Sequence, residues 1–135
     1  MRYYIIAGEA SGDLHGSNLI KEIKKLDKNS EFRCWGGDLI KEQCGNLVKH
    51  YKDYSYMGFF EVFKNIRKIV NNLSLCKKDI LNFKPDAIIY VDFPGFNMRI
   101  AKWAKSKNFI NHFYISPQIW AWKEGRINLL KKYVK

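Results

Sequence analysis

The fold of this chain is decided by the stretch Pro85-Asp86-Ala87-Ile88-Ile89-Tyr90-Val91-Asp92-Phe93-Pro94-Gly95-Phe96-Asn97. Five consecutive apolar residues, 87–91, predict a strand that is buried on both faces, because such a strand shows no polar alternation. Asp92 stands where this strand ends. A carboxylate is therefore expected at the carboxyl end of a buried parallel strand, where open α/β sheets bind ligands. On geometry alone, a carboxylate that only caps the turn explains Asp92 equally well.

The residues after Asp92 predict a turn followed by a helix. Pro94 restricts the preceding Phe93 to an extended conformation and has no N–H to donate. Gly95 permits a tight turn. Asn97 is then placed to cap a helix that begins near Met98.

Composition indicates one folded domain in 135 residues, with 47% hydrophobic and 16% aromatic residues. No apolar run approaches the roughly 20 residues of a membrane-spanning helix. The apolar run after Arg2 is too short for an export signal. The three cysteines are far apart and predict reduced thiols.

The chain carries 24 basic and 13 acidic residues, a formal net charge of +11. This excess favours an anionic partner, which is a nucleic acid, an anionic lipid or a phosphorylated substrate. Charge alone does not choose among these partners, and a lysine- and asparagine-rich genome is an alternative explanation for part of the excess.

Strand-like and helical stretches alternate along the sequence. The expected strands are Tyr3–Ala7, Glu31–Trp35, Leu47–Tyr51, Ala87–Val91 and Asn111–Ile115. Helices are expected after Gly16 with an apolar face from Leu19 to Leu26, and over Leu39–Cys44, Phe59–Asn82, Met98–Ser106 and Lys123–Lys135. This alternation predicts an α/β fold, a Rossmann-like parallel sheet with helices on both faces. The last helix has no closing signal, so we expect a longer protein.

The loop after the first strand is rich in glycine but does not fit a nucleotide-binding motif. Its glycines recur every four residues and not as G-x-G-x-x-G, and no Gly-Lys-Ser/Thr follows. Ser11 and the amides near Gly12 are placed to donate hydrogen bonds to a ligand at the helix start. An equally good interpretation is a tight turn in which Asp13 stabilises the first helical turn.

The stretch Met57–Leu73 combines aromatic and basic residues at helical spacing. Its narrow apolar seam, which suits packing on the sheet, contains Phe59, Phe63, Ile66, Val70 and Leu73. Further apolar residues widen the face, and basic residues flank it. The pattern is typical of a helix on an anionic membrane or of a groove for acyl chains, and core packing is the alternative.

A third stretch, Tyr114–Lys123, places Ser116-Pro117 after a strand on the same sheet edge as Asp92. Its two tryptophans, Trp120 and Trp122, suit sugar or acyl contacts, or anchor a loop. The three histidines are dispersed, so no metal site is predicted.

Four ordered motifs resemble the amino-terminal signatures of lipid-A-disaccharide synthase, at compatible spacings over essentially the whole chain. They are Gly8-Glu9-Ala10-Ser11-Gly12-Asp13, Met57-Gly58-Phe59-Phe60-Glu61-Val62, Asp92-Phe93-Pro94-Gly95-Phe96-Asn97 and Ser116-Pro117-Gln118-Ile119-Trp120-Ala121-Trp122. The resemblance implies an inverting glycosyltransferase of the glycosyltransferase-B fold, with two Rossmann-like domains facing a cleft and no metal or other cofactor. The family transfers diacylglucosamine from UDP-2,3-diacylglucosamine to 2,3-diacylglucosamine 1-phosphate, in lipid A biosynthesis.

The resemblance also assigns roles to residues of this chain. Asp92 matches the proposed general base. The residues expected to bind substrate are Glu9, Ser11, Gly12, Asp13, Met57, Glu61, Asn97 and Ser116. The residues expected to contact acyl chains or membrane are Phe60, Val62, Phe63, Ile66, Ile69 and Val70.

The same resemblance sets expectations for the whole protein. Residues 1–135 would form an incomplete, acceptor-side amino-terminal domain without the carboxy-terminal UDP-binding domain. We therefore expect this chain alone to be inactive. The family implies a cytoplasmic protein, peripheral on the inner face of the bacterial inner membrane.

Two other functions stay open at this point. A different glycosyltransferase-B enzyme would act on a soluble sugar nucleotide and would show no membrane association. A basic Rossmann-like module would bind nucleic acid, but that function calls for basic residues clustered on one face, and here they are spread along almost every helix.

Overall fold

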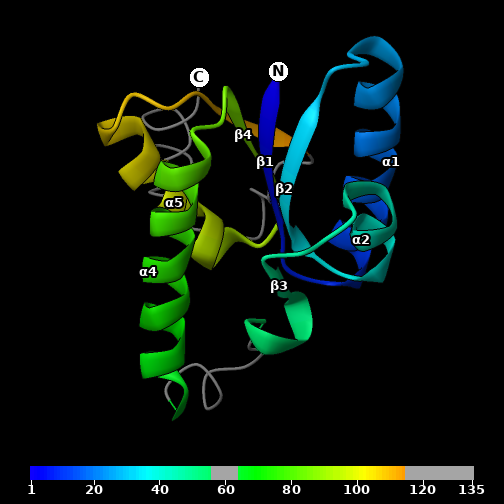
Figure 1. Cartoon of the computed structure of the whole chain (residues 1–135). Coiled ribbons are helices and arrows are strands. Elements are labelled where there is room, and N and C mark those ends of the chain that lie inside the picture. The colour runs from blue at the N-terminus through cyan, green and yellow to red at the C-terminus, as the bar shows by residue number, and fades with distance from the viewer. Residues whose placement is uncertain (56–63, 115–135) are drawn as a thin grey trace, which may run out of the picture.

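The chain folds around a five-stranded parallel sheet, seen in a computed structural model that describes residues 1–55 and 64–114. The strands lie in the order β3-β2-β1-β4-β5, so the chain crosses from one edge back past β1 to form the second half (Figure 1). Their bounds are β1 Arg2–Ala7, β2 Glu31–Gly36, β3 Lys49–His50, β4 Ala87–Val91 and β5 Asn111–Tyr114. This confirms the predicted Rossmann-like class.

Helices cover both faces of the sheet, as the alternation of elements predicts. The helices α1 (Ala10–Leu26) and α2 (Asp38–Cys44) lie on one face, and α4 (Ile66–Phe83) and α5 (Pro94–Ser106) lie on the other (Figure 1). A short 3-10 helix, η1 (Tyr51–Asp53), follows β3.

Two apolar clusters, one on each face of the sheet, form the core. Alternate residues of β4 divide between them: Ile88 and Tyr90 pack toward α4 and α5, whereas Ile89 and Val91 pack toward α1 and α2. All five β4 residues are buried, which explains the unbroken apolar run in the sequence.

The turn after β4 differs from the sequence prediction. Helix α5 begins at Pro94 and not near Met98, so Asn97 lies inside its first turn and does not cap it. Phe93 is not extended: its φ is 57° and its ψ is 61°. Helix α5 starts early because Pro94 suits the first position of a helix, where its fixed φ is already helical and its missing N–H costs nothing.

Helix α4 packs on the sheet by residues that match the predicted seam only in part. Its buried residues are Asn72, Cys76 and Ile80, and Leu73 is half-buried. Ile66 and Val70, which belong to the predicted seam, are each 57% exposed. The predicted helix began at Phe59, and its residues 59–63 lie outside the described ones, as do 115–135.

Candidate functional site

Asp92 begins the connection from β4 to α5 and has a left-handed backbone. Its φ is 51°, and Phe93 follows at φ 57°. Asparagine and aspartate adopt this conformation with little strain, but it is unfavourable for a bulky residue such as phenylalanine. Because Val91 pairs with Ala7 in the sheet, Asp92 stands beside the loop that leaves β1.

The ring of Phe93 lies over the end of β1. A Cβ atom added at Gly8 would come within 2.1 Å of Phe93 Cγ, so only glycine permits this approach. The same ring stacks on Phe96 at a centroid distance of 5.4 Å and contacts Tyr54 at 5.7 Å. These contacts hold the unusual backbone of the turn in place.

Asn97 links the Asp92 turn to β1 by two hydrogen bonds. Its side chain is fully buried, and Nδ2 donates to the carbonyl oxygen of Asp92 at 2.6 Å and to that of Ile6 at 3.3 Å. Its Oδ1 is buried and accepts no hydrogen bond from the residues that the structure describes. The side chain of Asn97 therefore bonds to the backbone of the Asp92 turn. Its predicted binding of substrate stays a prediction.

Tyr54 was not singled out from the sequence, yet it lines the same region. Its hydroxyl donates to the carbonyl oxygen of Ala7, and burial raises its pKa, so the hydroxyl keeps its proton. Nothing in the residues around Tyr54 distinguishes it from other aromatic residues, because its role depends on the return of the chain to the end of β1.

A mostly apolar pocket opens beside the Asp92 turn. It has a volume of about 270 Å³ and is lined by Tyr54, Ile69, Phe93, Pro94, Gly95, Phe96 and Arg99. Arg99 is exposed and is the one cation among these residues. The arrangement suits an apolar group that carries a negative charge at one end.

The loop after β1 brings two of the predicted substrate-binding residues to the same sheet edge. Ser11 donates to Glu9 through its hydroxyl, with Oγ and Oε1 3.3 Å apart. Ser11 is exposed and Glu9 is half-buried, so both side chains reach solvent. Gly12, by contrast, is buried, and a Cβ there would lie 3.4 Å from the carbonyl oxygen of Val91. It serves the close packing of α1 on the sheet.

Asp13 holds the start of α2. It is 5% exposed, and its Oδ1 accepts from the backbone amides of Gly37 at 2.8 Å and Ile40 at 2.9 Å. Its Oδ2 accepts from the amide of Leu39 at 3.0 Å. The carboxylate therefore caps a neighbouring helix, a role that neither sequence interpretation of Asp13 anticipated.

Of the predicted acyl-contact residues, the three described ones lie on α4. Ile69 is half-buried and lines the apolar pocket, whereas Ile66 and Val70 are exposed. The remaining site residues lie outside the described ones: Met57, Phe60, Glu61, Val62, Phe63 and Ser116. Within 1–55 and 64–114, no helix is long and apolar enough to cross a membrane, and no three side chains are grouped to hold a metal ion.

Comparisons with known proteins give one family. The model of the family described as lipid-A-disaccharide synthetase (LpxB) matches residues 3–135. The lipid-A-disaccharide synthase of Trichlorobacter lovleyi is 40% identical over 134 residues, 98% of this chain and 35% of the relative. That of Coxiella burnetii is 36% identical over 130 residues, 96% of this chain and 35% of the relative. This chain thus spans about a third of the length of these relatives.

A solved structure supports the fold. The crystal structure of UDP-GlcNAc 2-epimerase from Neisseria meningitidis bound to UDP-GlcNAc matches with a TM-score of 0.65. The identity is 12%, and the match covers 99% of this chain and 39% of the other. At this identity the likeness shows the Rossmann-like architecture alone. The family match over residues 3–135 goes further, and by it this chain belongs to the lipid-A-disaccharide synthetase family.

Proposed function

We propose that the protein to which this chain belongs transfers diacylglucosamine from UDP-2,3-diacylglucosamine to 2,3-diacylglucosamine 1-phosphate, with inversion at the anomeric carbon and release of UDP. The observation that carries this proposal is the placement of Asp92 in a member of this family. Its carboxylate follows β4 directly, in a left-handed turn beside an apolar pocket.

In this proposal Asp92 is the general base. Direct displacement at an anomeric carbon requires removal of a proton from the attacking hydroxyl, and a carboxylate about 2.6–3.2 Å from that hydroxyl can accept it. The strained backbone at Phe93 and the bonds from Asn97 fix the turn, which limits the directions in which the carboxylate can point. Glu9 and Ser11, on the adjoining loop, would bind sugar hydroxyls.

Acylated substrates also require apolar surface near this carboxylate. The pocket lined by Ile69, Phe93 and Phe96 provides this apolar surface. Arg99, which also lines the pocket, would bind a phosphate group. The exposed Ile66 and Val70 would lie against the membrane. The protein would then be cytoplasmic and peripheral on the inner face of the bacterial inner membrane, where lipid substrates reside.

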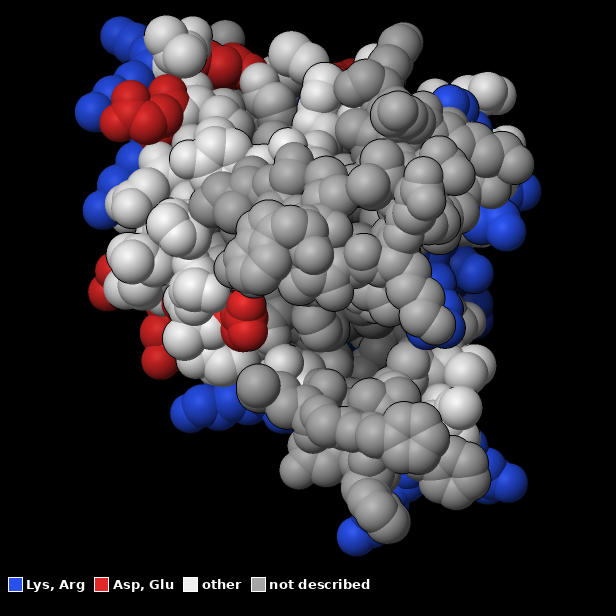
Figure 2. Space-filling model, turned by 180° about the vertical axis from the view of Figure 1, so that it is seen from behind, with Lys and Arg blue, Asp and Glu red and all other residues white. Residues whose placement is uncertain are grey.

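The charge distribution agrees with an anionic membrane as partner. In the view from behind, basic side chains stand without acidic ones along the edge formed by α4 and α5, whereas acidic and basic side chains are mixed near α1 and α2 (Figure 2). A basic edge beside exposed apolar residues is typical of binding to anionic lipid. Family membership also favours glycosyl transfer over the nucleic-acid-binding function.

A chimera tests the activity. In it, a relative supplies the part of its own chain that this chain does not match. The chain replaces the matched 134-residue segment of the Trichlorobacter lovleyi relative, and disaccharide formation is measured from both acylated substrates. We expect turnover by the chimera and none by this chain alone, because donor binding is assigned to the carboxy-terminal domain.

Asp92→Asn in the same chimera tests the base. Asparagine tolerates the left-handed backbone, so the fold and the melting temperature should not change. Turnover should fall by roughly 10²-fold to 10⁴-fold, the usual contribution of a general base. Near-normal turnover by Asp92→Asn would exclude the proton-accepting role, and a chimera that folds but is inactive with acylated substrates would contradict the proposed reaction.

A further inference from the structure

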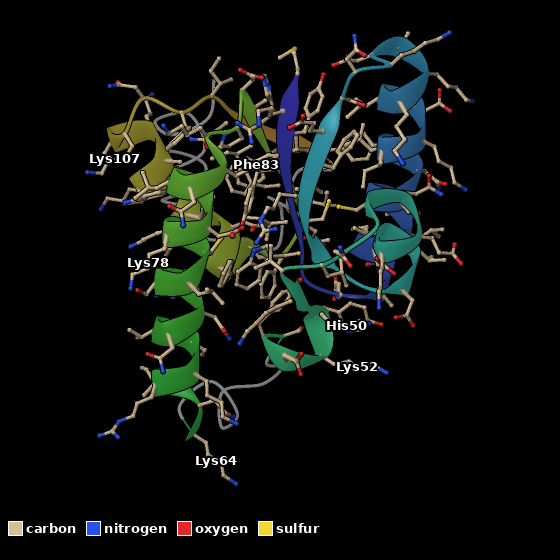
Figure 3. The ribbon with its side chains drawn as sticks, in the orientation of Figure 1. His50, Lys52, Lys64, Lys78, Phe83 and Lys107 are labelled. Carbon is tan, nitrogen blue, oxygen red and sulfur yellow. The ribbon has the colours of Figure 1, made fainter. Side chains whose placement is uncertain are left out.

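Two of the three cysteines lie together on the face of the sheet that α1 and α2 cover, and the proposed transfer uses neither. Cys34 is a fully buried residue of β2, and Cys44 is the last residue of α2, where it is half-buried. Both belong to the same apolar cluster. Figure 3 shows β2 and α2 side by side, with yellow sulfur between their ribbons. We call Cys34 and Cys44 the cysteine pair.

The two thiols of the cysteine pair are in direct contact. The Cys34 thiol donates a hydrogen bond to the sulfur of Cys44. A disulfide would draw the two sulfur atoms to a separation of about 2 Å. The end of α2 has room for this movement, because a Cβ atom added at Gly45 would meet no atom within 4 Å. Cys76 belongs to the other apolar cluster, on the opposite face of the sheet, so it meets neither member of the pair.

The surroundings of the cysteine pair favour a thiolate at Cys44. The hydrogen bond from Cys34 lowers the pKa of Cys44, burial opposes this effect, and the amide of Asn46 and the charge of Lys24 support it. The ammonium group of Lys24 donates to the carbonyl oxygen of Gln43, the residue before Cys44. A partly exposed thiol of lowered pKa that adjoins a second thiol is typical of cysteines that react with oxidants.

We propose that the cysteine pair is an oxidation site, at which hydrogen peroxide converts the two thiols into a disulfide bond. The Cys44 thiolate attacks one oxygen of the peroxide, so an S–O bond forms, the O–O bond breaks and hydroxide leaves. That hydroxide combines with the proton that Cys44 released when it ionised. The product at Cys44 is a sulfenic acid.

The buried thiol completes the reaction without contact to solvent. The sulfur of Cys34 attacks the sulfenic acid of Cys44, so the S–S bond forms, the S–O bond breaks, and the leaving hydroxide takes the proton of Cys34 as water. The two sulfurs together lose two electrons, and the peroxide is reduced to two molecules of water.

The oxidation site is separate from the proposed transfer. Neither member of the cysteine pair lines the apolar pocket beside Asp92, and disulfide formation requires no sugar substrate. All three thiols are free in the structure, in agreement with the sequence prediction of reduced cysteines. The structure is therefore that of the reduced form, and the disulfide forms on exposure to peroxide.

Peptide mapping of the purified chain tests the proposal. The native chain is treated with hydrogen peroxide, and its remaining thiols are blocked with iodoacetamide. Trypsin cuts after Arg33, Lys41 and Lys49, so the members of the cysteine pair fall on separate peptides, 34–41 and 42–49. We expect mass spectrometry to find these two peptides joined, and to find them separate again after treatment with dithiothreitol.

Three single variants identify the participating thiols. Cys34→Ala and Cys44→Ala should each lose the joined peptides, whereas Cys76→Ala, the matched control, should keep them. In Cys34→Ala the sulfenic acid at Cys44 has no neighbouring thiol, so its labelling by dimedone should rise roughly tenfold above that of the unaltered chain. Circular dichroism establishes that the variants fold, and the peptide map of the unaltered chain is decisive by itself where one does not.

Three outcomes would overturn the proposal. The first is a peroxide-treated native chain without joined peptides, whether or not Cys44 has gained oxygen. The second is a set of joined peptides that includes Cys76. The third is chains joined to one another on a non-reducing gel in place of the internal disulfide, since that would make Cys44 an ordinary exposed thiol.

Discussion

Asp13 is a buried carboxylate whose two oxygens accept hydrogen bonds from three backbone amides at the start of α2. Asp13→Ala would leave the amides of Gly37 and Ile40 buried without this acceptor. We expect the free energy of unfolding to fall by about 2 to 3 kcal/mol, the scale of hydrogen bonds to a charged group. Urea denaturation measures the change.

Asp38→Ala is the matched control for Asp13. Asp38 lies in the first turn of α2, but its side chain is exposed and pairs with His50 at the surface. A surface pair of this kind contributes at most about 1 kcal/mol. Equal destabilisation by the two substitutions would contradict the capping role of Asp13.

Cys44 differs from the other cysteines in exposure and in acidity. A hydrogen bond with the Cys34 thiol lowers the pKa of Cys44, whereas burial raises the pKa of Cys34 and of Cys76. The thiolate is the reactive form, so iodoacetamide should alkylate Cys44 first in the native chain. The rate should rise with pH, and its midpoint should lie at a lower pH than that of an ordinary thiol, because the pKa of Cys44 is lowered.

Mass spectrometry of peptides from the alkylated chain identifies the modified cysteine. In urea the three cysteines should react at similar rates, because burial and the Cys34 contact are lost together. Native alkylation of Cys76 as fast as that of Cys44 would contradict the difference in environment.

For single residues, the sequence predicted where a residue lies in the fold better than it predicted what its side chain contacts. The end of the apolar run identified where Asp92 stands, because a buried strand must stop at a charged residue. The partners of Asn97 and Asp13 are backbone groups at the end of β1, in the Asp92 turn and at the start of α2. Such contacts join residues up to 91 positions apart, and no local pattern encodes them.

Among the elements, α4 has two chemically different faces. Its inner face carries Asn72, Cys76 and Ile80, and its first turns expose Ile66 and Val70 to solvent. Ile66→Gln with Val70→Gln should leave the melting temperature nearly unchanged, since these side chains pack on little. Binding to anionic vesicles should weaken by up to roughly 10³-fold, because about 2 kcal/mol of burial is lost for each of the two large side chains that leave a lipid surface.

Leu75→Gln with Leu81→Gln gives a control on the same helix. Both leucines are exposed, but they lie one to four turns beyond Ile66 and Val70 along α4. They do not line the shallow pocket that Ile66, Arg67, Val70 and Asn71 form. We expect vesicle sedimentation of this variant to match that of the unaltered chain. Similar losses in the two variants would mean that no particular part of α4 meets the lipid.

The sequence predicted which segments are helices and which are strands wherever the hydrophobic period was clear. It did not predict the residues at which they begin and end. The strands and α2 lie close to their predicted positions. Helix α5 begins four residues early because Pro94, which stops a strand, also starts a helix well. The seam on α4 was right for Leu73 but wrong for Ile66 and Val70, because exposed apolar residues at the start of the helix have the same spacing as core residues.

At the scale of the whole molecule, one polar network joins β1, β2 and α4. Trp35 donates through Nε1 to the hydroxyl of Tyr4 at 2.7 Å, and that hydroxyl donates to Asp79 at 2.7 Å. Arg33 completes the network with two bonds of 2.7 Å to the same carboxylate. The network fixes the carboxyl-terminal half of α4 on the sheet.

Asp79→Ala removes the acceptor shared by Tyr4 and Arg33. Because Tyr4 is fully buried, its hydroxyl loses its acceptor and cannot reach water. We expect a loss of about 2 to 3 kcal/mol in the free energy of unfolding, measured by urea denaturation. Asp86→Ala, at an exposed residue that accepts one backbone bond from Arg2, should cost less than half as much. Equal costs would contradict the network's contribution.

The overall architecture could be predicted because alternation of strands and helices leaves few topologies. The network around Asp79 could not be predicted, since it depends on which face of β1 and β2 meets α4.

The phenyl ring of Phe93 over Gly8 limits how deeply anything can enter between the loops that follow β1 and β4. In many open sheets that space admits a planar or ring-shaped molecule above the strands. Here it is already filled by an aromatic ring of the protein itself. If Asp92 is the general base that we propose, its substrate must present the hydroxyl from the rim, with the bulk of the molecule outside the sheet.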